Sequence, residues 1–88
     1  MKFDPHRIIL FGSHAAGTAD AESDVDLIVV YETNKRFLDR LRELYTAWNL
    51  PKGVDILAYT PQEYEELRSS RQFVRDAVAG GKVLYERS

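Results

Sequence analysis

The sequence predicts a small α/β protein of the α+β type, in which a mixed β-sheet carries helices mainly on one face. Two short apolar segments follow one another with only the segment 14–23 between them, and the later apolar segments alternate with helical patterns. Turn residues separate the segments. Two directly successive strands followed by helix–strand units indicate a mixed sheet, in the order strand–loop–strand–helix–strand–helix–strand.

The first two strands are predicted from short apolar runs. Residues 7–11 (Arg-Ile-Ile-Leu-Phe) are rich in β-branched and aromatic side chains and end at Gly12-Ser13, which is typical of a strand buried on both faces. Residues 14–23 show no periodicity and are expected to form a loop. Residues 25–31 are apolar on both alternations apart from Asp26, which indicates a second central strand.

The remaining elements follow from helical spacing and capping signals. Residues 35–49 carry one apolar stripe of an amphipathic helix, formed by Phe37, Leu38, Leu41, Leu44, Tyr45 and Trp48. Arg40 lies off that stripe and is expected on a solvated face. A third strand is predicted over residues 54–59. Thr60, Pro61 and Glu63 are typical of a helix start with a capping box, and this helix should end at Gly80-Gly81, before a short strand over residues 83–85.

Length and composition limit the possible functions. With 88 residues, we expect one domain over residues 1–88. A net charge of −2 with mixed signs makes a broad nucleic-acid-binding face unexpected. The absence of cysteine excludes disulfides and thiolate zinc sites. No apolar run approaches the roughly 20 residues that cross a bilayer, so we expect a soluble, cytoplasmic protein without a membrane partner.

Asp24 and Asp26 are the first candidates for chemistry. They stand two residues apart at the start of the second strand, so strand alternation places both carboxylates on one face. Carboxylate oxygens suit Mg²⁺, which completes its coordination with waters and substrate phosphates. A third carboxylate, Asp55, opens the third strand, which we expect to lie beside the second, and would complete a two-metal site. There it could also accept the proton of an incoming hydroxyl.

Gly12 and Ser13 are candidates for binding phosphate. Glycine lets the backbone approach a phosphate closely, and the following N–H and hydroxyl groups can donate to its oxygens. Each signal has an ordinary structural explanation when it stands alone, since Asp-x-Asp pairs often solvate turns and Gly-Ser often forms one. Gly-Ser, ten residues and then Asp-x-Asp should occur by chance in on the order of one in a thousand chains of this length.

These motifs resemble those of the minimal nucleotidyltransferases, small members of the DNA polymerase β-like superfamily. The resemblance rests on Leu10-Phe11-Gly12-Ser13, on Ser23-Asp24-Val25-Asp26 with the apolar run behind it, and on Val54-Asp55-Ile56-Leu57. It implies a polymerase β-like palm fold, two Mg²⁺ ions held by Asp24, Asp26 and Asp55, and ATP whose triphosphate lies against Gly12 and Ser13. Relatives often have a helix before the first strand, which is not seen here and would leave apolar surface for a partner.

The resemblance implies an enzyme that transfers a nucleotide, AMP from ATP, to an acceptor hydroxyl. Many small relatives act as antitoxins toward a helical HEPN-type toxin, in some cases by adenylylating a tyrosine of the toxin. The alternative is a catalytically weak or inactive binding module that neutralises a helical partner by forming a complex. A third hypothesis is a small-molecule transferase of the aminoglycoside-modifying kind. The small size of the chain also leaves a homodimer open.

Overall fold

The computed structural model describes residues 4–12, 15, 17, 24–50 and 53–87. The elements, in chain order, are β1 (Arg7–Phe11), β2 (Val25–Val30), α2 (Phe37–Ala47), β3 (Val54–Tyr59), α3 (Pro61–Ser70), α4 (Gln72–Ala79) and β4 (Lys82–Glu86). This order confirms the prediction except that two helices replace the single last one. No helix within the described ranges has the length and apolar character needed to cross a membrane.

The strands form one four-stranded mixed sheet in the order β3-β2-β1-β4. β2 runs parallel to β3, whereas β1 runs antiparallel to both of its neighbours, β2 and β4. The apolar first and second strands occupy the two central positions, as their patterns predicted. The predicted fold class, a small mixed sheet with helices, is therefore confirmed.

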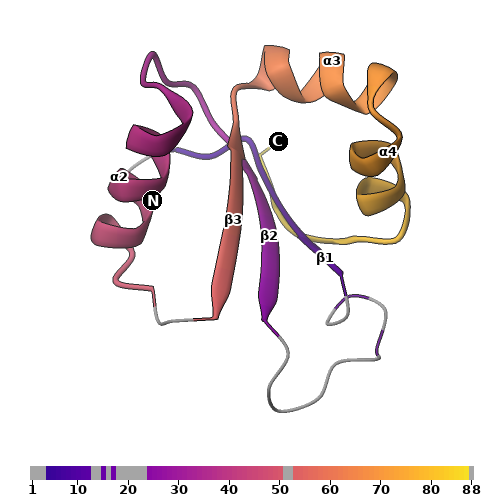
Figure 1. Ribbon diagram of the computed structural model, residues 1–88, viewed down its shortest axis with the longest axis horizontal. Coiled ribbons are helices and arrows are strands. Elements are labelled where there is room, and N and C mark those ends of the chain that lie inside the picture. Colours follow the sequence, from indigo (N-terminus) through magenta and orange to yellow (C-terminus); the bar gives the residue numbers. More distant parts are fainter. Residues whose placement is uncertain (1–3, 13–14, 16, 18–23, 51–52, 88) are drawn as a thin grey trace.

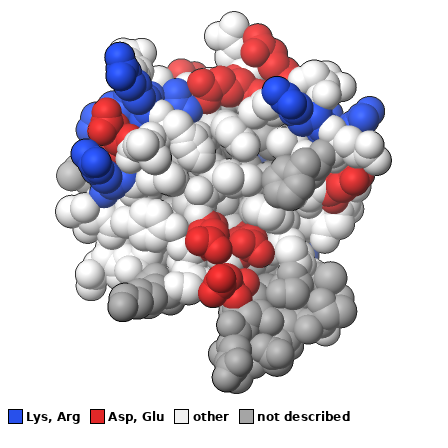
Figure 2. All heavy atoms as spheres, in the orientation of Figure 1, with Lys and Arg blue, Asp and Glu red and all other residues white. Residues whose placement is uncertain are grey.

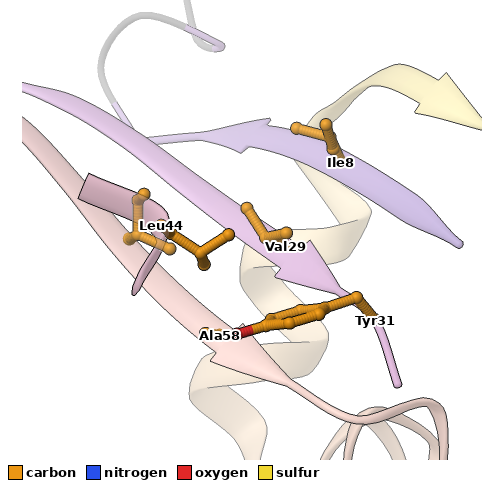
Figure 3. Packing of buried hydrophobic residues seen from close by; sticks show 6 residues of the cluster. Ile8, Val29, Tyr31, Leu44 and Ala58 are labelled. Carbon is orange, nitrogen blue, oxygen red and sulfur yellow. The ribbon is translucent and has the colours of Figure 1, made fainter. Parts of the chain in front are cut away.

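The two faces of the sheet bury separate apolar clusters. On one face Ile8 and Val29 pack with Leu44 of α2 (Figure 3). On the other face Ile9 and Ile28 pack with Tyr64 of α3. Consecutive strand residues therefore point to opposite sides, as the pleat requires.

The helices are divided between the faces more evenly than the sequence predicted. α3 and α4 share one face, and α2 lies on the other (Figure 1). The reason is the connectivity, because the parallel strands β2 and β3 can be joined only by a crossover that passes over a face of the sheet, and α2 provides it. The chain then returns from β3 to β4 over the opposite face through α3 and α4.

The predicted capping box at the start of α3 is present. The Glu63 backbone N–H donates to Thr60 Oγ1 at 3.1 Å, and the Thr60 N–H donates to Glu63 Oε1 at 2.9 Å. The helix then breaks at Arg71, whose φ of −114° and ψ of 116° are extended. No glycine or proline marks this break in the sequence. The second helix directs Val74, which is buried, and the half-buried Ala77 toward the sheet.

The expectation that Arg40 lies on a solvated face is wrong. Its residue surface is only 8% exposed. The guanidinium group donates to the backbone carbonyls of Lys35 at 2.7 Å and Ala58 at 3.1 Å, and it also pairs with Glu63. These partners lie on three different parts of the chain, which a helical periodicity alone does not reveal.

Candidate active site

The three candidate carboxylates lie at one end of the sheet. Asp24 directly precedes β2, Asp26 is the second residue of β2, and Asp55 is the second residue of β3. Asp26 and Asp55 are register partners across the parallel β2–β3 ladder. This pairing confirms the sequence prediction that the strand bearing Asp55 lies beside the strand bearing Asp26. Neighbouring strands are about 4.8 Å apart, so the backbones at these two residues lie close together.

Strand alternation places these residues on a common face. Ile28 has the same parity as Asp26 in β2, and Leu57 has the same parity as Asp55 in β3. Ile28 and Leu57 both belong to the cluster beneath α3 and α4. Asp26 and Asp55 therefore lie on the face of the sheet that packs against α3 and α4, at the end of the sheet outside its buried part. Asp24 and Asp55 are exposed, and Asp26 is half-buried.

Gly12 provides space for the Asp26 carboxylate. It follows β1 with a φ of +75°, and its neighbour Phe11 is the register partner of Asp26 across the β1–β2 ladder. A Cβ atom at Gly12 would overlap Asp26 Oδ2, whereas a Cβ atom at Gly17, whose φ is +77°, would meet nothing within 4 Å. Glycine is therefore needed at position 12 both for its backbone conformation and for this close approach. Ser13 lies outside the described residues.

Two further residues stabilise this end of the sheet, and the sequence analysis identified neither of them. Gly53, with a φ of +88°, accepts a hydrogen bond at its carbonyl from the Val25 N–H at 2.7 Å. The Tyr45 hydroxyl of α2 donates to the carbonyl of Val54, directly before Asp55. The glycine turn before the third strand is a signal that could have indicated Gly53. No pattern in the sequence distinguishes the Tyr45 hydroxyl from the apolar stripe on which it lies.

The end of the sheet is acidic. Figure 2 shows acidic side chains gathered at this end of the molecule, and among the residues drawn in colour no Lys or Arg lies within the group. Neighbouring carboxylates repel one another and attract a divalent ion. The donor set, which is all oxygen and partly exposed, is chemically suited to Mg²⁺ rather than to a softer metal.

The carboxylates do not form a complete ligand cage. Among the residues that the structure describes, no group of three or more His, Cys, Asp or Glu side chains is arranged to hold a metal ion. Mg²⁺ sites in phosphoryl-transfer enzymes usually use one or two carboxylates together with substrate phosphates and waters. Metal binding by Asp24, Asp26 and Asp55 therefore stays a prediction.

Comparison with known proteins finds related sequences that are named as adenylyltransferases. A candidate protein adenylyltransferase of Methanocaldococcus jannaschii, MJ1305, is 36% identical over 86 residues, which cover 91% of this chain and 58% of the relative. The chain thus spans less than two thirds of the relative's length, and activities of the longer protein do not transfer to it directly.

Solved structures show the same fold. The crystal structure of a candidate nucleotidyltransferase from Sulfolobus solfataricus aligns with a TM-score of 0.64 and 20% identity, over 94% of this chain and 65% of that one. A toxin–antitoxin crystal structure with AMP-PNP aligns with a TM-score of 0.57 and 26% identity, over 96% and 63% of the two chains. The family described as "Polymerase beta, Nucleotidyltransferase" matches residues 1–88. This chain, with its aspartates at the ends of adjoining strands, belongs to the polymerase β nucleotidyltransferase family.

Proposed function

We propose that residues 1–88 form a single nucleotidyltransferase domain that transfers AMP from ATP to an acceptor hydroxyl. The observation that carries this proposal is the register pairing of Asp26 with Asp55, on strands that present both carboxylates on one face. Asp24 lies at the same end of the sheet, and Gly12 lies against the Asp26 carboxylate. Family membership supports the reaction class, and the geometry of this edge supports its location.

The reaction would be an in-line displacement at the α-phosphorus of ATP. The acceptor oxygen forms the new O–P bond, its proton passes to the Asp55 carboxylate, and the bond to the β-phosphate breaks so that pyrophosphate leaves. Asp24, Asp26 and Asp55 would hold two Mg²⁺ ions, which when bound neutralise the developing charge on the phosphate oxygens. Gly12 and Ser13 would lie against the triphosphate, where glycine leaves room for the approach.

For the acceptor we propose a tyrosine of a helical HEPN-type toxin, so that the protein acts as a cytoplasmic antitoxin. The support is the likeness to a toxin–antitoxin structure that contains AMP-PNP and to a candidate protein adenylyltransferase. A tyrosine hydroxyl is nucleophilic once deprotonated, and a nearby carboxylate can take its proton.

A second candidate is a binding module that neutralises its partner without turnover. The observation that favours it is the absence of a three-carboxylate metal arrangement within the described ranges. On this hypothesis the acidic end of the sheet no longer has a catalytic role, and complex formation alone inactivates the toxin.

Calorimetric titration of ATP with and without Mg²⁺ distinguishes the two candidates. The active enzyme should bind ATP in a magnesium-dependent manner, and the double variant Asp24→Asn/Asp26→Asn should lose that binding. Asp76→Asn, which removes an exposed carboxylate of α4, is the matched control and should bind as the wild type does. With the partner protein present, mass spectrometry should show addition of AMP to a tyrosine. If the partner is silenced without any such addition, and ATP binding is absent, the binding module is supported instead.

A further inference from the structure

The carbonyl groups along β3 point alternately toward β2 and away from it. Those of Gly53 and Tyr59 accept hydrogen bonds from the Val25 N–H at 2.7 Å and from the Tyr31 N–H at 2.9 Å. Because carbonyl direction alternates along a strand, the even-numbered residues of β3 turn their carbonyls to the outer edge. β3 is the last strand on this side of the sheet, so no strand among the described residues meets these carbonyls.

Two of the outward carbonyls accept hydrogen bonds from side chains of α2 instead. The Tyr45 hydroxyl donates to Val54, the first residue of β3. Arg40 Nη1 donates to Ala58, near the other end of the strand, at 3.1 Å. The C-terminal end of α2 points toward the end of the sheet at which β3 begins (Figure 1). The Tyr45 contact is therefore the one that lies at the acidic end.

Tyr45 is itself held firmly in place. Its ring packs against the apolar cluster that contains the fully buried Leu44. Its backbone carbonyl accepts from the Leu50 N–H at 3.3 Å, directly after Asn49, whose φ is +48°. Both the core and the turn that leaves α2 thus fix this residue, so its hydroxyl presents a donor to β3 from a constant position.

The carbonyl that Tyr45 binds belongs to the peptide group leading into Asp55. A peptide group is planar from one Cα atom to the next, so the Val54 carbonyl lies in one plane with the Asp55 Cα atom. On the other side of β3, the Val25 N–H that donates to the strand lies in one plane with the Asp24 Cα atom. Two consecutive peptide groups of β3 are therefore fixed, one by β2 and one by α2, and they connect the backbones of two candidate metal ligands.

We propose that Tyr45 is a positioning residue of the acidic end. Its hydroxyl sets the orientation of the Val54–Asp55 peptide group and so directs the Asp55 carboxylate to the place where it can share a metal ion with Asp26. This inference rests on the proposed function, in which these carboxylates hold Mg²⁺. The Mg²⁺ ion requires ligand oxygens at about 2.1 Å in nearly octahedral geometry. Asp55 is exposed, so the direction of its side chain depends on the backbone that carries it.

Tyr45→Phe tests the hydroxyl alone, because it keeps the ring and its packing. Calorimetric titration of ATP in the presence of Mg²⁺ should show binding about tenfold weaker than that of the wild type, as expected when a group that orients a metal ligand is lost. Tyr85→Phe removes a tyrosine hydroxyl from the exposed strand β4. It is the matched control and should bind ATP as the wild type does.

Arg40→Met separates positioning from stability. It removes the other α2 contact with β3, at Ala58, and it should lower the urea midpoint more than Tyr45→Phe does. The folded Arg40→Met protein should nevertheless keep the ATP affinity of the wild type, whereas Tyr45→Phe should lose affinity with little loss of stability. If the loss of binding instead follows the loss of stability across these variants, Tyr45 has only a structural role and the proposal is wrong. Circular dichroism should confirm that each variant is folded.

Amide hydrogen exchange tests the position of β3 without any nucleotide. In Tyr45→Phe the Val25 amide, which bonds to the Gly53 carbonyl, should exchange about tenfold faster than in the wild type. The Tyr31 amide, bonded to Tyr59 at the far end of β3, should keep its rate. An unchanged rate at Val25, or a faster rate with unchanged ATP binding, overturns the proposal. A wild type that binds no ATP overturns the proposed function instead, and exchange at Val25 then decides the role of Tyr45.

Discussion

Arg40 and Glu63 are joined by two hydrogen bonds, from Nη1 to Oε1 at 2.6 Å and from Nη2 to Oε2 at 3.1 Å. This pair connects α2, on one face of the sheet, with α3, on the other, around the edge formed by β3. Arg40 is also bonded to the carbonyl of Ala58 in β3, and Glu63 also caps α3 through Thr60. The two residues thus hold both helical layers to the same strand.

Loss of the Arg40 guanidinium should destabilise the fold markedly. Arg40→Met leaves the Glu63 carboxylate without its cation and two backbone carbonyls without their donor, so we expect a loss of about 2–3 kcal/mol in the free energy of unfolding. Urea unfolding measures it. Arg68→Met is the matched control, because Arg68 and Glu65 form an exposed pair at 2.8 Å, and its effect should stay within about 0.5 kcal/mol. Equal effects of the two substitutions would contradict a structural role for Arg40.

Acid should remove the stabilisation that the Arg40–Glu63 pair gives to the folded state. The hydrogen bond from Arg40 lowers the pKa of Glu63 below its ordinary value of 4.5. The Thr60 contacts also lower this pKa, whereas burial of the carboxylate partly opposes the shift. The folded state therefore binds the proton more weakly than the unfolded state, so the stabilisation is present above about pH 4.5 and is lost as the pH falls through the folded pKa. Urea midpoints of the wild type and of Glu63→Gln should differ at neutral pH and converge on acidification. A constant difference down to the acid transition would refute this linkage.

The start of α3 shows what the sequence predicts well. Thr60, Pro61 and Glu63 lie within four consecutive positions, and the physical requirement of a helix N-terminus is local, so the capping box could be predicted and is confirmed. The role of Arg40 could not be predicted, because its partners come from the segment before α2, from β3 and from α3. An arginine on a helical surface pattern looks the same whether it is solvated or paired across a sheet edge.

The candidate site, like the fold, could be predicted only in part from the sequence. Their positions at the heads of two strands expected to be neighbours predicted that Asp26 and Asp55 would lie close together, and the ladder places them as register partners. The distribution of the helices over two faces and the break at Arg71 depend on the packing of the whole chain, and no local pattern indicates them. Ser13 lies outside the described residues, so its part in the site stays a prediction.

The glycines that join α4 to β4 offer a matched pair for testing close packing. A Cβ atom at Gly81 would stand 2.7 Å from the Ala77 carbonyl oxygen and 2.9 Å from that of Leu10, whereas at Gly80 the nearest atom is 3.5 Å away. Neither glycine has a positive φ, so the two substitutions differ mainly in contact. Gly81→Ala should cost about 1–3 kcal/mol of unfolding free energy through overpacking against backbone. Gly80→Ala should change it by less than about 1 kcal/mol, and thermal unfolding of both variants measures the difference.

Gly12 and Gly17 provide a second matched pair, which tests the role of the acidic end of the sheet. Both have a positive φ, so alanine brings a comparable backbone strain of about 1 kcal/mol at either position. Only at Gly12 would the new methyl group overlap Asp26 Oδ2. On the proposed function, Gly12→Ala should displace that carboxylate and weaken magnesium-dependent ATP binding by about tenfold or more, equivalent to about 1.4 kcal/mol. Gly17→Ala should retain that binding within a few fold. Calorimetric titration at matched folded fractions gives the comparison, and equal losses in the two variants would show that backbone strain, rather than the position of Asp26, limits nucleotide binding.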